Sequence, residues 1–186
     1  MNASRIAESN LVGSLLLAHP GLEDPNFRRA VILLSAHSGD EGAMGVILNR
    51  PLNQTLGEYD GSLVYSDLAN VPLYEGGPVQ AGQMILSAWS WSEEKKIFRL
   101  FFGIDAEKAK ELRDDQNMEL RAFLGYSGWG KSQLEGELAQ NTWVLANINS
   151  DVLHGLEDDD LWRTILSEVS LEMKLLADFP DDPSRN

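Results

Sequence analysis

Residues 125–132, GYSGWGKS, match the phosphate-binding pattern G-x-x-x-x-G-K-S/T letter for letter. In such a loop the backbone N–H groups surround the phosphates, the lysine reaches the β and γ oxygens, and the hydroxyl binds Mg²⁺. Trp129, however, places the bulkiest side chain inside the loop, and the chain ends at residue 186, too soon for the remaining elements of such a fold. No later strand is predicted to end in an apolar run followed by aspartate. We therefore interpret the match as accidental and predict that the chain binds no nucleotide.

A capping box explains the same letters without a ligand. Ser132 followed by Glu135 fits the S-x-x-E pattern, in which the serine side chain closes the start of a helix, here predicted over residues 133–140. A nucleophile elbow, G-x-S-x-G, would need glycine at position 129, where this chain has tryptophan. We therefore expect Ser127 to be a loop hydroxyl rather than a nucleophile.

Metal ligands and general bases are scarce in the sequence. His19, His37 and His154 each lie in a polar segment near carboxylates, and none shows a compact spacing such as H-x-x-x-H. We interpret them as loop or turn histidines, while a general base among them stays open. The absence of cysteine excludes disulfides, thiolate metal sites and cysteine nucleophiles. We expect neither a metal nor a cofactor, and we interpret the acidic run 158–160 as the start of a helix rather than a metal site.

Three short motifs remain as candidates for a binding site: LNRP at residues 48–51, GGPV at residues 76–79 and GYSGW at residues 125–129. Each is predicted where a strand ends in a turn, and loops on a rigid scaffold often carry function. We hypothesise one concave surface, in which Arg50 presents its charge and glycines let backbone amides approach a ligand. That surface would be formed by Asn49, Arg50, Gly76, Gly77, Gly128, Trp129 and Gln133. The alternative is that the motifs are separate turns and that Arg50 forms a surface salt bridge.

The elements that must position these residues are short strands, with helices mainly in the second half of the chain. Runs rich in branched apolar side chains predict strands, and short connections make neighbouring strands antiparallel. Strands are predicted at residues 13–18, 29–36, 43–48, 84–90, 96–104, 119–125 and 142–148. Helices are predicted at residues 106–113, 133–140 and 158–176, the last with an apolar face formed by Leu161, Ile165, Val169 and Met173. Residues 52–72 are expected to be irregular apart from one helical turn near residues 66–69, and the core is expected to contain Trp129, Trp143 and Trp162.

Several segments, taken in order, resemble one known family. They are LLLAHPGLEDPNFRRAVILLSAHSGDEGAMGVILNRP, YEGGPV, FLGYSGWGKSQLEGELAQNTW and LWRTIL. Over roughly residues 11–169 the chain is similar to the YqgE/AlgH family of bacterial proteins, and Lys131 and Ser132 fall on spacer positions of its motif GW-x-x-x-QLE. The resemblance implies an α+β domain whose mostly antiparallel sheet bends into an irregular barrel-like core, with helices packed outside. It also implies the bacterial cytosol and no agreed catalytic residues, and its members are commonly described as uncharacterised proteins or candidate transcriptional regulators.

Length and charge set the outer limits. We expect one domain over residues 1–186, with mobile ends at 1–10 and 178–186. The first ten residues do not form a signal segment, and no apolar run approaches the ~20 residues of a membrane span, so we expect a soluble, cytoplasmic protein. A net charge of −14 repels nucleic acid and anionic membranes, and the one basic cluster, residues 95–113, is interleaved with acidic side chains.

The sequence supports no specific reaction. We expect a non-catalytic binding or regulatory module that acts through an unknown protein or small-molecule partner, without direct binding of DNA, nucleotide or membrane. The alternative is an unrecognised enzyme with a polar loop site around Arg50 and Trp129. A concave pocket with histidines or carboxylates whose pKa is shifted by burial would favour the enzyme.

The purified protein is predicted to have no substantial affinity for duplex DNA. Without a dense cluster of Lys and Arg, binding gains little free energy from the release of counterions. Mobility-shift assays at low salt should therefore show no complex. Nanomolar binding that weakens steeply as the salt concentration rises would contradict this prediction.

Overall fold

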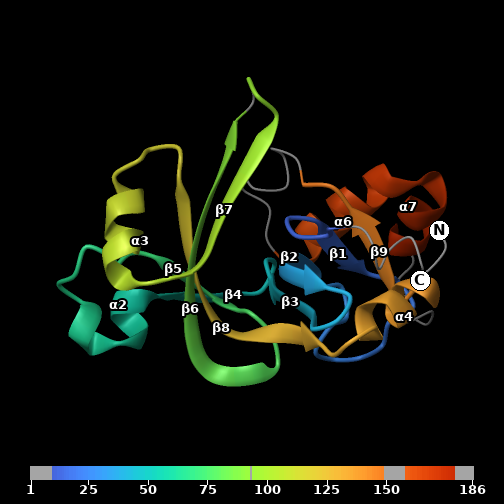
Figure 1. Ribbon diagram of the computed structural model, residues 1–186, viewed down its shortest axis with the longest axis horizontal. Coiled ribbons are helices and arrows are strands. Elements are labelled where there is room, and N and C mark those ends of the chain that lie inside the picture. The colour runs from blue at the N-terminus through green and yellow to red at the C-terminus, as the bar shows by residue number, and fades with distance from the viewer. Residues whose placement is uncertain (1–9, 93, 149–157, 179–186) are drawn as a thin grey trace.

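The computed structural model describes residues 10–92, 94–148 and 158–178, so the ends predicted to be mobile lie almost entirely outside the described residues. The described chain forms a nine-stranded sheet with short helices around it (Figure 1). The strands are β1 (Leu15–Ala18), β2 (Val31–Ser38), β3 (Gly42–Ile47), β4 (Pro51–Thr55), β5 (Pro72–Glu75), β6 (Val79–Ser92), β7 (Ile97–Ile104), β8 (Glu119–Trp129) and β9 (Trp143–Ala146). The helices are α2 (Leu56–Tyr59), the 3-10 helix η1 (Gly61–Leu63), α3 (Ala106–Arg113), α4 (Gln133–Ala139), α6 (Asp158–Val169) and α7 (Leu171–Asp178).

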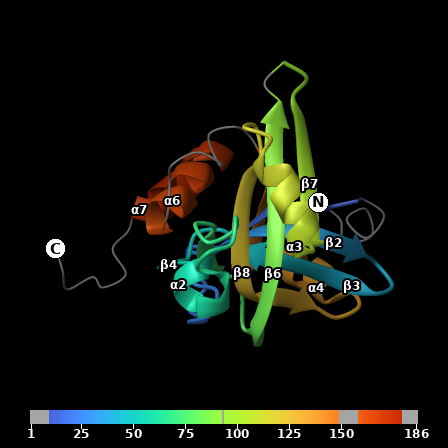
Figure 2. The ribbon, with the colours of Figure 1, turned by 90° about the vertical axis from the view of Figure 1, so that its left-hand side faces the viewer.

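The sheet curls into a half-barrel and is mostly antiparallel, which confirms the expected α+β class. Its order is β4-β5-β8-β3-β2-β1-β9, while β6 pairs with β8 on one side and with β7 on the other. β8 joins two parts of the sheet. Its first part pairs with β5 and β6, and its last three residues pair with β3. Figure 2 shows the β6–β7 hairpin rising beyond the other strands, with α3 beside it. This projection creates the cleft described below.

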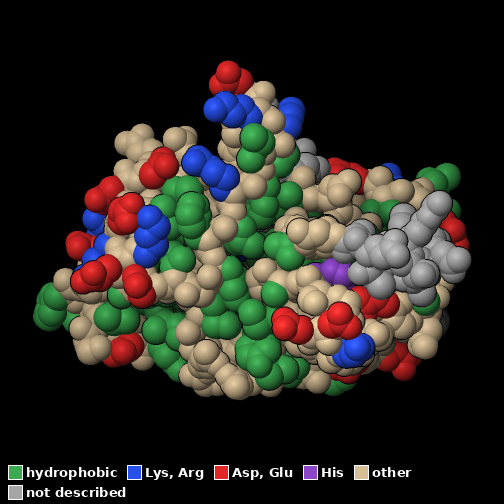
Figure 3. Space-filling view, in the orientation of Figure 1, with side chains coloured by type: hydrophobic (Ala, Val, Ile, Leu, Met, Phe, Trp, Pro, Cys, Tyr) green, Lys and Arg blue, Asp and Glu red, His purple; other side chains and the backbone are tan. Residues whose placement is uncertain are grey.

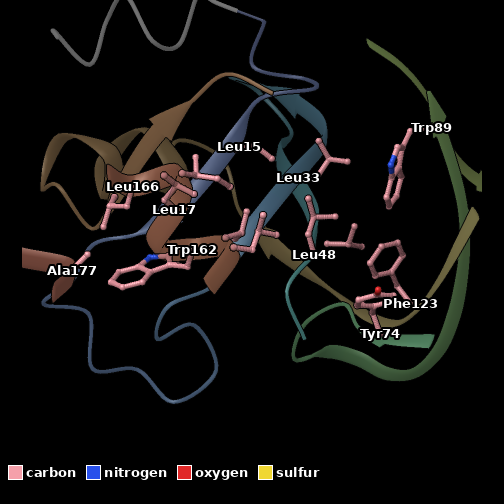
Figure 4. Packing of buried hydrophobic residues seen from close by; sticks show 14 of the residues in the cluster. Leu15, Leu17, Leu33, Leu48, Tyr74, Trp89, Phe123, Trp162, Leu166 and Ala177 are labelled. Carbon is pink, nitrogen blue, oxygen red and sulfur yellow. The ribbon is translucent and has the colours of Figure 1, made fainter. Parts of the chain in front are cut away.

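Both faces of β1 and of residues 31–34 in β2 are buried, which explains why these residues form continuous apolar runs rather than alternating ones. Alternate residues divide between two core clusters. Leu15 and Leu17 belong to the cluster that also contains Trp89, Phe123 and Trp162 (Figure 4). The residues between them face a second cluster on the other side of the sheet. The core therefore has two layers, separated by β1 and β2.

The helix predicted at residues 158–176 is two helices, separated at Ser170. The hydroxyl oxygen of Ser170 accepts a hydrogen bond from Met173 N at 3.1 Å and so begins the second helix. Ile165 lies in the core as expected, whereas Val169, next to the break, is 41% exposed. The regular spacing of apolar residues did not indicate that the helix would be interrupted at Ser170.

The segment predicted to be irregular, residues 52–72, contains most of β4 together with α2 and η1. Thr55 and Glu58 form a capping box at the start of α2, in which Thr55 N donates to Glu58 Oε2 at 2.7 Å. This backbone hydrogen bond, with a second from the Thr55 hydroxyl, lowers the pKa of the Glu58 carboxyl. Elsewhere the predicted strands are present, but β6 begins before and β8 ends after the predicted bounds.

Asn49 joins three parts of the fold. Its Nδ2 donates to the carbonyl oxygens of Arg29 and Asp158 at 2.9 and 2.8 Å, and its Oδ1 accepts from Val31 N at 2.8 Å. An ion pair between Arg29 and Asp159 lies beside these bonds. The buried amide therefore links the end of β3 to the start of β2 and to the first turn of α6.

Replacement of Asn49 by alanine is predicted to lower the free energy of unfolding by about 2–3 kcal/mol, because it leaves buried backbone groups without hydrogen bonds. Urea unfolding followed by tryptophan fluorescence measures the change. The control is Asn70→Ala, an exposed asparagine, which should change stability by no more than about 0.5 kcal/mol. Equal stabilities for the two variants would show that the Asn49 network contributes little.

Candidate functional site

The glycines of the GGPV motif allow a close crossing of two backbones rather than the approach of a ligand. Gly76 and Gly77 are buried, and a Cβ atom on Gly76 would overlap the carbonyl oxygen of Gly125. Gly77 has a φ of +145°, and a Cβ there would overlap the backbone of Tyr126. Any side chain at either position would therefore push the chain away from β8.

Arg50 and Trp129 do not meet. Arg50 is half-buried, with Nη1 3.4 Å from Glu75 Oε1, and Nη2 faces backbone carbonyls of the preceding loop. Trp129 is 6% exposed and pairs with Ala43 at the start of β3, whereas Arg50 follows the end of that strand. The whole length of β3 separates them.

The predicted concave surface is therefore wrong as a single site. Asn49, Gly76, Gly77 and Trp129 are buried within the fold, and Gly128 pairs with Met44 in the sheet. Gln133 begins α4, where its Oε1 accepts from Gly130 N at 3.0 Å and its Nε2 donates to Glu137 Oε1 at 2.9 Å. Arg50 does form the salt bridge of the alternative. The motifs are not separate turns, however, because Arg50 O accepts from Glu75 N at 2.9 Å and Ser127 Oγ donates to Gly76 O at 3.3 Å.

The stretch GYSGWGKS is not a phosphate loop in this fold. Residues 125–129 form the end of β8, and its backbone pairs with β3 instead of curving around an anion. Lys131 Nζ lies 2.9 Å from Asp40 Oδ1. Ser127 is fully buried, and its hydroxyl donates to the Gly76 carbonyl oxygen at 3.3 Å, so the expectation of a loop hydroxyl is wrong. This geometry supports the interpretation of the match as accidental.

The predicted capping box at Ser132 is also wrong. Ser132 has a φ of +60° and its side chain makes no capping hydrogen bond. Glu135 is instead buried, with Oε1 3.0 Å from His37 Nε2, so that it joins the β2–β3 hairpin to α4. His19 behaves as the predicted turn histidine, because its Nδ1 accepts from Gly21 N at 3.1 Å. His154 lies outside the described residues.

The predicted core tryptophans are confirmed by their burial, and their N–H groups have partners. Trp129 and Trp143 both donate to Glu137 Oε2, at 2.8 and 2.7 Å, and their rings meet edge to face with centroids 5.8 Å apart. Trp162 donates to the Ala18 carbonyl oxygen at 2.8 Å. These indoles therefore hold α4 and α6 on the sheet.

A cleft of about 350 Å³ lies beside the β6–β7 hairpin. It forms because β8 begins at Glu119, which pairs with Trp89, while β6 continues to Ser92. The loop that leads into β8 forms the opposite wall. The described residues that line the cleft are Trp89, Ser90, Trp91, Gln116, Asn117, Met118 and Glu119.

A buried ion pair lies directly beside this cleft. The Arg121 guanidinium lies against two aromatic rings, with its Cζ atom 4.5 Å from the Tyr74 centroid and 5.1 Å from that of Trp89. Its Nε and Nη2 lie 2.8 and 2.6 Å from Glu119 Oε1, and its Nη1 donates to the Leu48 carbonyl oxygen at 3.1 Å. Figure 4 shows Tyr74 and Trp89 on the same inner face of the curved sheet. Arg121 is held rigidly, while the Glu119 side chain is 31% exposed.

Two buried polar atoms next to this pair, Trp89 Nε1 and Ser87 Oγ, have no hydrogen-bond partner within the described part of the chain. Ser87 lies opposite Arg121 and Trp89 opposite Glu119, so these side chains share one face of the sheet. Buried polar groups in proteins are nearly always hydrogen-bonded. Because an indole N–H can only donate, a group with an acceptor oxygen would satisfy it.

Sequence reasoning missed this cleft, although one signal was present. The strands at residues 84–90 and 119–125 were predicted, and Trp89 and Arg121 fall within them. The sequence did not indicate the register of β6 against β8, which places Trp89 opposite Glu119 as the last described pair of these two strands. Trp89 and Trp91, two residues apart on one strand, were the available indication of a shared aromatic face.

Comparison with known proteins places the fold in a family. The model of the AlgH-like family matches residues 15–174. The chain belongs to the AlgH-like family. This AlgH-like chain is 36% identical to a UPF0301 protein of Streptomyces coelicolor, with 96% of each chain covered. It is 33% identical to a UPF0301 protein of Cytophaga hutchinsonii, over 94% of this chain and 98% of that protein.

Two solved structures share the AlgH-like fold. A crystal structure of a protein from Corynebacterium diphtheriae matches with a TM-score of 0.66 and 23% identity, and covers 90% of this chain and 91% of its own. The solution structure of the AlgH protein from Pseudomonas aeruginosa matches with a TM-score of 0.64 and 24% identity, and covers 94% and 96%. At these identities the similarity shows the fold alone.

The surface of the AlgH-like chain carries mixed charges around the hairpin. Figure 3 shows acidic and basic side chains together at the hairpin tip, with hydrophobic side chains below them. Glu94, Lys95 and Lys96 are all exposed there. Throughout the described ranges, no helix is long and apolar enough to cross a membrane.

ATP and GTP are predicted not to bind to the GYSGWGKS stretch, because its backbone is a strand and Lys131 pairs with Asp40. Equilibrium dialysis with Mg²⁺ and labelled nucleotide measures binding directly. Lys131→Ala should behave like the unmodified protein in this assay, and, since Lys131 is exposed, its stability should change by no more than about 0.5 kcal/mol. Micromolar binding that Lys131→Ala abolishes would refute the prediction.

Proposed function

We propose that the chain is a non-catalytic binding module whose ligand occupies the cleft beside β6. The observation that carries this proposal is the presence of two tryptophans, Trp89 and Trp91, and of the Arg121–Glu119 pair around one cleft. Binding pockets typically combine aromatic walls with a few well-placed polar groups, and this cleft has that composition. Its volume suits a small molecule or a short segment of a partner protein.

The chemistry of the cleft favours binding over catalysis. Glu119 Oε1 is already engaged by Arg121, which lies 2.6 and 2.8 Å away through Nη2 and Nε. Ser90 is the one hydroxyl side chain among the described residues that line the cleft, and its Oγ accepts a hydrogen bond from Arg99 Nε at 3.2 Å. A serine nucleophile needs a base to take its proton, and a guanidinium cannot do so. The enzyme hypothesised around Arg50 and Trp129 has no support, since these residues do not meet.

A regulatory role, if the chain has one, would operate through this ligand and not through DNA. The net charge of −14 opposes contact with nucleic acid phosphates.

A thermal-shift screen of metabolites is predicted to find ligands that depend on the cleft. A ligand at 100 times its Kd adds about 2.7 kcal/mol of stability, or roughly a 5–10 °C rise in Tm for a domain of this size. Trp91→Ala and Gln116→Arg should weaken the affinity for such a ligand at least tenfold. Tyr65→Ala is the matched control, because Tyr65 is fully exposed and does not line the cleft. If every ligand found binds both cleft variants as tightly as the unmodified protein, the site is elsewhere.

A further inference from the structure

We propose that an exposed apolar surface around α2 binds a basic segment of a partner protein, in which Lys or Arg side chains flank apolar ones. This surface, called here the α2 surface, is formed by Leu52, Tyr59, Val64 and Tyr65. None of these residues lines the cleft beside β6. The inference therefore goes beyond the proposed function and does not depend on it.

The segment that carries the α2 surface has a well-defined backbone. Asp60 ends α2 and begins η1, where its Oδ1 accepts from Ser62 N at 2.9 Å. Two turns follow, because Leu63 N donates to Asp60 O at 2.9 Å and Ser66 N donates to Leu63 O at 2.8 Å. Side chains on such a backbone can contact a partner without the cost of first ordering the chain.

One side of this segment is buried and the other is exposed. Leu56 and Leu68 are almost completely buried in a core cluster. The members of the α2 surface are 40–48% exposed, apart from Tyr65, which is fully exposed. Single exposed apolar side chains are normal on a protein surface, whereas a concentration of large ones marks an interaction site. Here four of them lie within residues 52–65, and two are tyrosines, which are enriched where proteins bind one another.

The α2 surface lies at one end of the molecule. Figure 1 shows α2 and α7 at opposite ends of the longest axis. Figure 3, in the same orientation, shows hydrophobic side chains among acidic ones at the end where α2 lies. Residues 10–92 are described without a gap, so every sequence neighbour of the α2 surface belongs to the described part of the chain.

The charge around the α2 surface is negative. Residues 51–94 contain no Lys or Arg. Asp67 pairs with Arg113 of α3, whose Nη1 lies 3.2 Å from Asp67 Oδ1. Glu58 and Asp60 have no basic partner within the described ranges, and their carboxylates accept hydrogen bonds from Thr55 and Ser62. These two carboxylates are therefore the ones that a basic partner could pair with.

Both carboxylates are ionised at neutral pH. Hydrogen bonds from the side chain and backbone of Ser62 lower the pKa of the Asp60 carboxyl, as those from Thr55 do for Glu58. The α2 surface is consequently flanked by fixed negative charges.

The combination of phenol rings and carboxylates indicates a basic partner. Lys and Arg side chains can stack on the rings of Tyr59 and Tyr65 and pair with the carboxylates beside them. Apolar side chains of the same partner segment would pack on Leu52 and Val64. A second copy of this surface is a poor occupant, because it would bring like charges together.

Panning of a displayed library of random dodecapeptides against the full chain tests the proposal. We expect enriched peptides rich in Lys and Arg with apolar residues between them. Tyr65→Ala and Tyr59→Ala should bind the synthetic peptides at least tenfold more weakly, since aromatic side chains commonly dominate such contacts. Replacing Glu58 by Gln together with Asp60 by Asn should also weaken binding, and added salt should do so by screening the charges.

The controls separate lost contacts from lost structure. Tyr65→Ala should leave the fold intact, because Tyr65 is fully exposed. Leu171→Ala is the matched control, since Leu171 is an exposed apolar residue of α7, and it should bind the peptides normally. In an NMR titration of the unmodified chain with a selected peptide, the shifts should map to residues 52–65.

Four outcomes would overturn the inference. They are a library that yields no basic peptide, peptides that Tyr65→Ala binds within about twofold of the unmodified chain, NMR shifts that map to residues 116–119 instead, and a dimer that Tyr65→Ala abolishes. None of them removes the cleft as a binding site, because Tyr65 does not line it. Conversely, a thermal-shift screen without any ligand that depends on Trp91 would refute the proposed function and leave the α2 surface untouched.

Discussion

The close crossing of Gly76 and Gly77 beneath β8 is the constraint on which the half-barrel depends. Gly76 N donates to the Leu124 carbonyl oxygen at 2.8 Å, and its own carbonyl oxygen accepts from Ile47 N at 3.0 Å. One residue thus connects β8 and β3 where β8 passes from one half of the sheet to the other. A side chain at this point would separate those strands, and only glycine adopts the φ of Gly77 without strain.

The cleft is a consequence of that crossing. With its last residues fixed on β3, β8 extends back along β6 only as far as Glu119, whereas the hairpin continues. Arg121 then joins three strands at the base of the cleft, because Tyr74 belongs to β5 and Trp89 to β6. Both aromatic rings contact the guanidinium, and its N–H groups donate to Glu119 and to a backbone carbonyl oxygen.

Local sequence patterns predicted the elements of this fold but not the contacts between distant ones. Apolar runs identified the strands around Leu33 and Ile47, because burial on both faces leaves a clear compositional signal. The candidate site failed because LNRP, GGPV and GYSGW were taken as loops. The glycines that suggested access for a ligand serve contact between backbones, and Ser127 is buried by the same crossing. Glu135 had the spacing of a cap yet pairs with His37, a residue 98 positions away that no local pattern could indicate.

Two carboxylate contacts among the described residues, His37–Glu135 and Arg121–Glu119, differ in their access to solvent. A buried ion pair is weak evidence for stability, because apolar residues of similar volume often serve as well. The side chains of His37 and Glu135 are 2% and 8% exposed and join a hairpin to α4, so their contact is nearly closed to solvent. Arg121 is similarly buried, but Glu119 is 31% exposed and faces a cleft lined by indoles. The Glu119 carboxylate can therefore be contacted by a partner in the cleft, whereas the side chains of His37 and Glu135 mainly contact each other within the fold.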